Sequence, residues 1–384
     1  MRVAAFRFTY IGPVDGHDLP ALCRHLQMAA AVEDGPVLLH VRTCKGKGYA
    51  PAEKDPTHFD GVGHFEPETG LLIPSSNKTP SFTGIFGKTL VELAEKDDRL
   101  LAITAAMPEG TGTNLFEERF PERFVDVGIC EQHAVTFAAG LAASGFHPVV
   151  AIYSTFLQRG YDEVNHDIAR MGGNVVVGID RCGVIGEDGV SHQGIFDVSL
   201  LLPVPGIILA QGRDAAESAR LLVTGFTAEG PYFLRYSKNA MPEQPLSREP
   251  LPIGRWERLR EGEITVITYG DFVGEAEEAA RLLEMDGICM GLVNARFLKP
   301  YDAEMMNTLL AEGKPLLVYE EVAGIGGLGS LLQQVAAGQE SRTPVHLLAL
   351  PDRWIYHGKR RELLRRMGLD AAGLRKTVRE LLGR

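Results

Sequence analysis

Glu131 is a carboxylate at a position in the chain where chemistry could occur. It follows the strand predicted at Phe124–Val127 and begins the helix predicted at Glu131–Ala143, whose later residues are almost wholly apolar. The helix dipole favours an acidic residue in the first turn, and this alone would explain Glu131. However, a helix that is apolar all round is expected to be buried, and a buried carboxylate needs a partner. Glu131 is therefore a candidate catalytic residue.

Aromatic and basic residues follow the next predicted strand, Pro148–Ile152. Tyr153 and Phe156 supply aromatic faces, and Arg159 supplies a cation at the same strand end. Because ligands bind at the carboxyl ends of strands in doubly wound sheets, these residues are candidates for a binding site. Ordinary helix packing with a surface salt bridge is the simpler explanation when the segment is taken alone.

A glycine-rich segment follows the strand predicted at Asn174–Ile179. It contains Arg181, Asp188 and His192, and its glycines permit tight turns beside a ligand. Arg181 and His192 could bind an anion or transfer protons. Turns use the same residue types without any function, so this loop is weak support by itself.

A fourth candidate site is the basic segment Lys45-Gly46-Lys47-Gly48-Tyr49. Lysines between glycines suit phosphate binding through ammonium groups and backbone N–H groups. The segment is not a P-loop, because the chain contains no GxxxxGK[ST] pattern, and a solvated basic turn explains it equally well.

Two further cations lie at the end of the strand predicted at Tyr232–Tyr236: Arg235 is near its last residue, and Lys238 comes after it. The four segments and this cationic rim together place one carboxylate, one histidine, several aromatic rings and several cations at strand ends. This set suits a phosphorylated small molecule or an organic cofactor with a diphosphate. The spacing alone does not identify the reaction.

The elements that must position these residues alternate between short apolar strands and amphipathic helices. This alternation predicts an α/β fold with mostly parallel sheets and helices on both faces. We expect two doubly wound domains, 81–245 and 256–384, after an incomplete N-terminal remnant in 1–80. Ser81 is expected to cap a helix that ends near Lys96, and a continuous helix is predicted at Leu157–Arg170.

Composition excludes several function classes. Among 384 residues, 50 acidic and 39 basic side chains give a net charge of −11, which argues against a general nucleic-acid surface. No apolar run approaches the roughly 18 residues that span a bilayer, so we expect no membrane association. The five cysteines form no CxxC pair, and with no signal peptide recognised this predicts a cytoplasmic protein without a zinc site.

Several longer strings carry a resemblance to a known family. They are the segment Tyr10–Asp18, Lys45–Tyr49 with Pro51–Pro56, Glu131–Gly140, Ala151–Arg159, His192–Gly194 with Phe196–Asp197, and Arg296–Pro300. In this order they resemble 1-deoxy-D-xylulose-5-phosphate synthase, a thiamine-diphosphate enzyme family of the transketolase superfamily. The resemblance covers essentially the whole chain. It implies that 81–245 is the pyrimidine-binding domain, that 256–384 is the transketolase C-terminal domain, and that 1–80 is the tail of a diphosphate-binding domain.

The resemblance also implies an activity. The family joins pyruvate and D-glyceraldehyde 3-phosphate, with loss of CO2, to give 1-deoxy-D-xylulose 5-phosphate for isoprenoid, thiamine and pyridoxal synthesis. Glu131 would hydrogen-bond N1′ of the cofactor's aminopyrimidine, Phe156 would stack on that ring, Tyr49 would contact the cofactor and Lys45 would approach its diphosphate. The substrate pocket would be lined by Tyr153, Arg159, Arg181, Asp188 and His192, with His192 also catalytic, and by Lys238.

Three departures from the family's pattern affect this expectation. The GDG…N motif that binds Mg²⁺ and diphosphate is absent, so we assign no metal ligand in the chain and expect it to need a missing domain or a partner for activity. Asp60 stands where the family has a substrate-contacting His, and His58 and His64 are out of register. Lys238 replaces an Arg and loses its bidentate phosphate geometry.

Three hypotheses stay open at this point. The first is a synthase acting as a partial chain, in a homodimer or in a hetero-oligomer with a diphosphate-binding chain. The second is the β-like subunit of a split transketolase or 2-oxoacid dehydrogenase. The third is a non-catalytic paralogue that regulates an intact synthase. The strings at Tyr10–Asp18 and Pro51–Pro56 favour the synthase.

Overall fold

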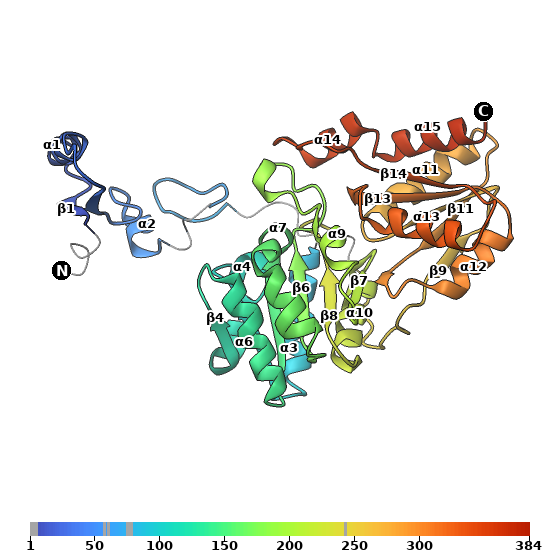
Figure 1. The fold of residues 1–384 in the computed structure, drawn as a ribbon, viewed down its shortest axis with the longest axis horizontal. Helices are drawn as coiled ribbons and strands as arrows, with labels where there is room; N and C mark the ends of the chain where they lie inside the picture. The colour runs from blue at the N-terminus through green and yellow to red at the C-terminus, as the bar shows by residue number, and fades with distance from the viewer. Residues whose placement is uncertain (1–6, 57–58, 60–61, 74–79, 242–243) are drawn as a thin grey trace. The chain divides into compact units, whose positions relative to one another are not determined.

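The computed structural model describes residues 7–56, 59, 62–73, 80–241 and 244–384, in two units that divide between Lys78 and Thr79 (Figure 1). In the first unit, β1 (Thr9–Asp15) and β2 (Val37–Arg42) pair in parallel, and α1 (Leu19–Ala30) connects them. The Asp18 carboxylate caps α1 by accepting from the Ala21 amide, and α2 (Ala50–Lys54) follows. The sequence predicts a helix at Leu19–Val32 and a strand at Val37–Thr43, and α1 and β2 confirm both, whereas β1 and α2 were not predicted.

The second unit contains a seven-stranded sheet in the order β12-β7-β8-β6-β5-β3-β4. Six strands are parallel, and β12 is an antiparallel edge strand paired with β7. The central strands β6, β7 and β8 carry only buried residues, and β3 and β5 each have a single partly buried residue, as expected for a sheet covered on both faces. The strands are β3 (Leu100–Thr104), β4 (Phe124–Asp126), β5 (His147–Tyr153), β6 (Val176–Asp180), β7 (Ile208–Gln211), β8 (Tyr232–Arg235) and β12 (Phe297–Lys299).

A five-stranded sheet follows in the order β14-β13-β10-β11-β9, with β9 as an antiparallel edge strand. The strands are β9 (Glu257–Arg260), β10 (Ile264–Thr268), β11 (Met290–Asn294), β13 (Leu316–Ala323) and β14 (Val345–Leu350). The helices associated with this sheet are α11 (Phe272–Glu284), α12 (Ala303–Ala311), α13 (Leu328–Gly338), α14 (Arg360–Met367) and α15 (Ala371–Leu381).

Helices cover both faces of the seven-stranded sheet. One face packs against α3 (Phe82–Ala94) and α10 (Ala215–Thr227), and the other packs against α6 (Glu131–Ala143). Side chains alternate between the two apolar clusters along the strands: Val149 and Ala151 belong to one, and Val150 and Ile152 to the other. Two doubly wound, mostly parallel sheets and a small N-terminal sheet confirm the predicted fold class.

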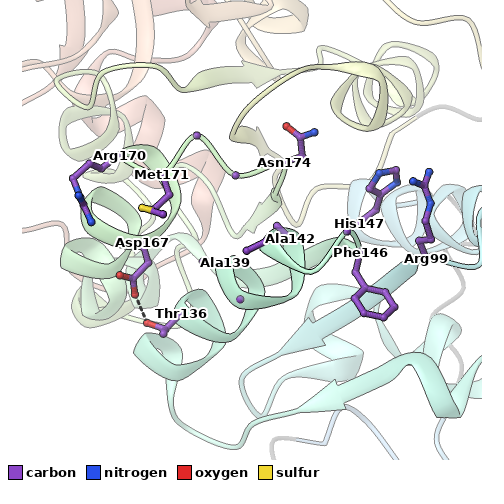
Figure 2. Close-up of a pocket in the computed structure, with 15 residues that line it drawn as sticks. Arg99, Thr136, Ala139, Ala142, Phe146, His147, Asp167, Arg170, Met171 and Asn174 are labelled. Carbon is purple, nitrogen blue, oxygen red and sulfur yellow. Dashed lines mark hydrogen bonds between the residues drawn. The ribbon is translucent and has the colours of Figure 1, made fainter.

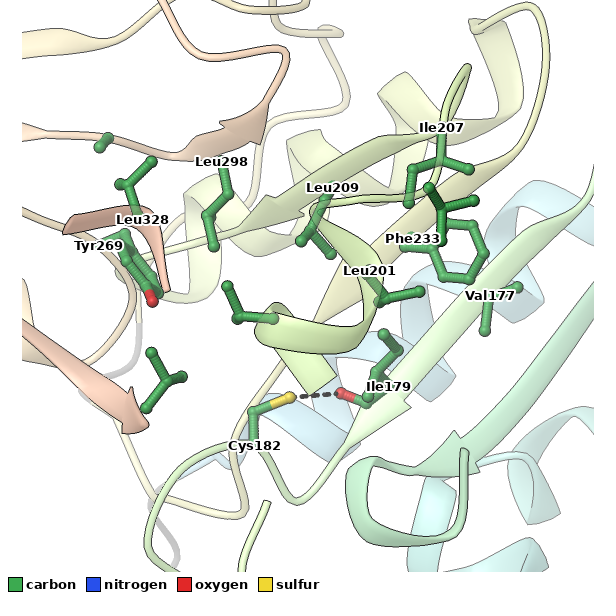
Figure 3. Close-up of a cluster of buried hydrophobic side chains, with 14 of the residues drawn as sticks. Val177, Ile179, Cys182, Leu201, Ile207, Leu209, Phe233, Tyr269, Leu298 and Leu328 are labelled. Atoms are coloured by element: carbon green, nitrogen blue, oxygen red, sulfur yellow. Dashed lines mark hydrogen bonds between the residues drawn. The ribbon is translucent and has the colours of Figure 1, made fainter. Parts of the chain in front are cut away.

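Figure 3 shows that one apolar cluster continues from the seven-stranded sheet, called the first sheet below, to the elements of the five-stranded sheet, called the second sheet. Leu201 and Leu209 lie on the side of the seven-stranded sheet, and Tyr269 and Leu328 lie on the side of the five-stranded sheet. Leu298, the middle residue of β12, lies between them and is fully buried. The two sheets therefore share a core.

Two expectations about helices are wrong. The segment predicted as one helix at Leu157–Arg170 is instead α7 (Ser154–Leu157), a 3₁₀ turn, α8 (Tyr161–Glu163) and a π-helical stretch, Val164–Ala169. Helix α6 is not buried on every side: Ala134, Val135 and Ala138 face the core, whereas Thr136 and Gly140 are exposed. Its exposed positions include the small residues Gly140 and Ala143, which the apolar sequence did not distinguish from core positions. Among the described helices, none has both the length and the apolar character needed to traverse a bilayer.

Candidate functional site

Glu131 begins α6 as a buried carboxylate at the carboxyl end of β4. Its side chain is only 3% exposed, and its Oε2 atom lies 3.2 Å from Nη1 of Arg159. Arg159 is 46% exposed, because it lies on the 3₁₀ turn that replaces the predicted helix. Arg159 neutralises the buried negative charge of Glu131. The ion pair also joins two candidate residues that were predicted at the ends of different strands.

Four predicted residues form a continuous stack at the ends of β5 and β6. The rings of Tyr153 and Phe156 are parallel, with centroids 5.8 Å apart, and the His192 ring meets Phe156 edge-on at 5.4 Å. On the other side, the Arg181 guanidinium lies over the Tyr153 ring at 4.5 Å. Burial raises the pKa of the Tyr153 hydroxyl to about 12, so this hydroxyl stays protonated at neutral pH.

Arg181 is held by residues that the sequence analysis did not single out. Its backbone is left-handed, with φ of 62°, and its Nη1 atom donates to the Gly110 carbonyl oxygen at 2.7 Å. Nη1 also lies 3.0 Å from Oδ2 of Asp180, which accepts from the Thr83 hydroxyl at 2.8 Å. Asp180 ends β6 and is fully buried, and this burial raises its pKa to about 6.

Lys238 and Asp188 face each other across two loops, with 3.7 Å between Nζ and Oδ1. Lys238 follows β8, and Asp188 lies in the glycine-rich loop that also carries His192. A cavity of about 260 Å³ opens beside Lys238 and is also lined by Ser237, Asn239 and Arg360. Its lining also includes Glu187, so two cations and one carboxylate line this cavity, a balance that suits a small anionic ligand.

Lys45 and Tyr49 belong to the first unit and are described within it. Lys45 is exposed. Tyr49 donates its hydroxyl to the Pro67 carbonyl oxygen at 2.8 Å and packs against Phe59 and Phe65. Asp60, the residue expected to replace a substrate-contacting His, lies outside the described residues, as does His58.

The strand ends hold buried polar atoms that lack hydrogen bonds within the described part of the chain. These atoms are Glu131 Oε2, Ser154 Oγ and Arg181 Nε. Buried polar groups are normally hydrogen-bonded, so such atoms at one sheet edge fit a site that receives a ligand with polar groups. A buried carboxylate beside an aromatic stack fits a nitrogen heterocycle such as an aminopyrimidine. Among the described residues there is no group of His, Cys, Asp or Glu side chains that could hold a metal ion.

A larger cavity lies elsewhere on this unit. It has a volume of about 670 Å³ and contains none of the predicted site residues. Figure 2 shows the exposed face of α6 on one side, where Thr136 donates to Asp167 at 2.5 Å, and His147 and Asn174 near the starts of β5 and β6. Because it lies toward the amino ends of the strands, this cavity is separate from the strand-end site.

Three family models match the chain. The model described as transketolase, pyrimidine binding domain, matches residues 78–244, and the one described as transketolase, C-terminal domain, matches residues 254–374. The model described as 1-deoxy-D-xylulose-5-phosphate synthase matches residues 1–43. The two transketolase models cover the residues that form the seven-stranded and five-stranded sheets.

Curated relatives match along the whole chain. A 1-deoxy-D-xylulose-5-phosphate synthase of Oleidesulfovibrio alaskensis is 48% identical over 391 residues, covering 100% of this chain and 61% of the relative. One of Desulforudis audaxviator is 50% identical over 375 residues, covering 97% of this chain and 59% of the relative. The chain thus spans about three fifths of the length of these relatives.

A solved structure described as a split gene transketolase, inactive beta4 tetramer, is also similar. It superposes with a TM-score of 0.70 at 29% identity and covers 79% of this chain and 98% of that chain. A chain of comparable content therefore exists as a separate polypeptide in a related protein.

Proposed function

We propose that this chain, which belongs to the 1-deoxy-D-xylulose-5-phosphate synthase family of the transketolase superfamily, supplies the pyrimidine side and the substrate side of a thiamine-diphosphate site. The observation that carries the proposal is the buried Glu131 carboxylate at a strand end rich in aromatic rings, whose Oε2 atom has an ion pair with the half-exposed Arg159 but no hydrogen bond within the described residues. The division of the chain into 1–80, 81–245 and 256–384 is part of this proposal.

The proposed reaction joins pyruvate to D-glyceraldehyde 3-phosphate with loss of CO2, giving 1-deoxy-D-xylulose 5-phosphate for the isoprenoid pathway. Bound thiamine diphosphate supplies the electron sink that makes loss of CO2 from pyruvate feasible. Glu131 would hold and exchange a proton with the aminopyrimidine N1′, and Phe156 would pack on that ring. Lys45 and Tyr49 are assigned to the same cofactor on the resemblance of their motif.

The remaining residues are assigned to the substrates. Arg181 is pre-oriented by Asp180 and Gly110, so it presents a fixed cation to an anionic substrate without reorganisation. His192, whose Nδ1 lies 2.9 Å from the Ser191 hydroxyl, is placed to exchange a proton with a substrate oxygen. Tyr153, Arg159 and Asp188 complete the pocket wall, and Lys238 would bind the phosphate of the aldehyde.

We assign the Mg²⁺ ligands and the rest of the diphosphate contacts to protein outside these 384 residues. This assignment rests on the absence of a metal-binding group among the described residues and on the length that the curated relatives have beyond the match. The 384-residue chain is therefore expected to be inactive alone. It would act within a longer polypeptide, or in a homodimer or hetero-oligomer that includes a diphosphate-binding chain.

To test the proposal, the N-terminal part of the Oleidesulfovibrio alaskensis synthase that this chain does not match is fused in front of this chain. With thiamine diphosphate, Mg²⁺, pyruvate and D-glyceraldehyde 3-phosphate, the fusion is expected to form 1-deoxy-D-xylulose 5-phosphate, and the 384-residue chain alone is not. Product from the chain alone, or a folded fusion without product, would refute the proposal.

A second candidate is the β-like subunit of a split transketolase, because the split gene transketolase chain is covered over 98% of its length. The same fusion separates the two activities. Transfer of a two-carbon unit between sugar phosphates, without use of pyruvate, would favour this second candidate. A non-catalytic paralogue would show neither reaction, and it would copurify with an intact synthase.

A further inference from the structure

Three charged side chains, one on the five-stranded sheet and two at the starts of its helices, meet beside the two substrate loops, which carry Lys238 and Asp188. Arg360, the first residue of α14, forms a two-pronged ion pair with Glu321 of β13: Nε lies 3.0 Å from Oε1, and Nη2 lies 2.6 Å from Oε2. The same Nη2 atom lies 3.9 Å from Oδ2 of Asp271, which precedes α11. All three side chains are largely buried, so one guanidinium offsets two carboxylates.

Glu321 holds the beginning of the glycine-rich loop. Its Oε1 atom accepts from the Val184 amide at 3.0 Å. A Cβ atom at Gly183 would lie 2.5 Å from Oε2 of Glu321, so only glycine allows this approach. Farther along the loop, the Gly186 carbonyl oxygen accepts from the Gly358 amide at 3.2 Å. The loop that carries Asp188 and His192 is therefore attached to the second sheet.

Asp271 holds the other substrate loop. Its Oδ2 atom accepts from the Ser237 hydroxyl at 2.8 Å and from the Asn239 side-chain amide. These two residues flank Lys238, whose ammonium group lies 3.7 Å from Asp188. The Ser237 hydroxyl in turn accepts from the Asn239 amide at 3.2 Å, which closes a tight turn around Lys238.

We infer that Arg360 is a positioning residue that fixes the distance between Lys238 and the Asp188–His192 loop, and hence the width of the substrate cavity. It lines the same cavity as Lys238, but its guanidinium is paired with Glu321 and Asp271, so it acts through these carboxylates and the two loops that they hold. The inference rests on the proposed function, because both loops are assigned there to the substrates, and Lys238 to the phosphate of the aldehyde.

The physical reason is the cost of leaving two buried carboxylates without their common cation. Burial raises the pKa of Glu321, and Arg360 opposes this rise by favouring the charged carboxylate. Without the guanidinium, Glu321 and Asp271 would repel each other, so Asp271 would rotate away, and Glu321 would rotate away or take up a proton. In either case the Val184 amide and the Ser237–Asn239 turn lose a fixed acceptor.

The test is hydrogen–deuterium exchange on the 384-residue chain, which needs no activity. In Arg360→Met, peptides that contain Val184–Gly186 and Ser237–Met241 are expected to exchange at least about tenfold faster, while α15 is unchanged. Arg360→Lys keeps the charge and is expected to restore part of the protection. The matched control is Arg375→Met, which removes another two-pronged ion pair, with Asp286, far from these loops in the fold.

Two results would overturn the inference. The first is that both loops exchange in Arg360→Met at the wild-type rate. The second is that Arg360→Met speeds exchange throughout the five-stranded sheet while Arg375→Met speeds exchange in the two loops as much as Arg360→Met does. In the active fusion, Arg360→Met is further expected to raise KM for D-glyceraldehyde 3-phosphate at least about fivefold, with kcat within about twofold of the wild type. Binding of the ground state and binding of the transition state would be weakened equally, which raises KM and leaves kcat unchanged. An unchanged KM would contradict the inference. An inactive wild-type fusion would refute the proposed function, and the exchange result would then decide whether Arg360 positions the two loops.

Discussion

Asp180 shows at the scale of single residues how burial and charge organise the site. It is fully buried and is contacted by Arg181 and Thr83, and burial nonetheless raises its pKa from 3.8 to about 6. A carboxylate with a raised pKa binds its proton more tightly in the folded state than in the unfolded state. Its contribution to stability therefore falls as pH rises from about 4 to about 6, and it is constant above that.

Asp180→Asn removes this titration while it keeps the side-chain shape. The free energy of unfolding of the native chain, relative to that of Asp180→Asn, is expected to fall by about 1 kcal/mol between pH 5 and pH 7, as a pKa shift of about two units requires. Urea unfolding at both pH values measures this difference. A difference that is the same at pH 5 and pH 7 would show that Asp180 keeps its ordinary pKa.

The sequence predicted the residues that face the site more readily than the residues that hold them. Glu131 and Arg181 follow predicted strands closely, so their positions near strand ends, combined with the apolar helix after Glu131 and the glycines after Arg181, marked them as candidates. Thr83 and Gly110 are far from Arg181 in sequence and reach it only through folding, so no local pattern marks them. Asp180 immediately precedes Arg181 and could have been identified as its partner from that adjacency.

The loop from Gly183 to Gly194 shows at the scale of elements how glycine permits the site. Its two ends exchange hydrogen bonds, from the Gly183 amide to the Gly194 carbonyl oxygen at 2.7 Å and in the reverse direction at 2.9 Å. A Cβ atom at Gly194 would lie 1.9 Å from the Arg181 carbonyl oxygen, which is backbone and cannot rotate away. Closure of this loop therefore requires glycine at its end.

Gly194→Ala is expected to lower the free energy of unfolding by about 2 kcal/mol or more, because the backbone must shift to relieve the overlap. Gly140→Ala is the matched control: it lies on the exposed face of α6 with open space at its Cβ position, so it should be neutral or stabilising by about 0.5–1 kcal/mol. Thermal unfolding of both variants measures the difference. Equal melting temperatures for the two would contradict the close approach at Gly194.

Regular elements were predictable where periodicity was clean, and the irregular ones were not. Ser81 caps α3 as expected, by accepting from the Gly84 amide, and the predicted bounds of α6 are those of the structure. The prediction of one continuous helix after β5 was wrong because the helical spacing of apolar residues continues across a 3₁₀ turn and a π-helical stretch. That interruption brings Arg159 to Glu131, so the exception to the pattern lies at the site.

At the scale of the whole molecule, the second unit has two sheets that share one apolar cluster. The antiparallel strand β12 links them further, because it follows the second sheet's β11 in sequence yet pairs with β7 of the first sheet. Such long-range pairing is invisible to local sequence patterns, and β12 was not predicted. The alternation of strands and helices predicts the two layers, but it carries no information about this crossing of the chain.

Leu298→Ala is expected to destabilise both sheets together by about 2–5 kcal/mol, because Leu298 is fully buried in the shared cluster. Hydrogen exchange of the slowest amides in β6 and in β10 measures each sheet separately. Both should speed up by the same factor if the sheets unfold cooperatively. Faster exchange in one sheet alone would show that they are independent.

The most direct test of the central claim is the effect of Glu131→Gln on turnover by the fusion described above. Loss of the carboxylate is expected to reduce formation of 1-deoxy-D-xylulose 5-phosphate at least about 100-fold, since proton exchange at the cofactor ring is lost. The melting temperature should stay within a few degrees of the wild-type value, and Glu118→Gln, an exposed carboxylate on α5 (Asn114–Arg119), should keep full activity. Activity of Glu131→Gln within a few fold of the wild type would contradict the assignment of this strand-end site.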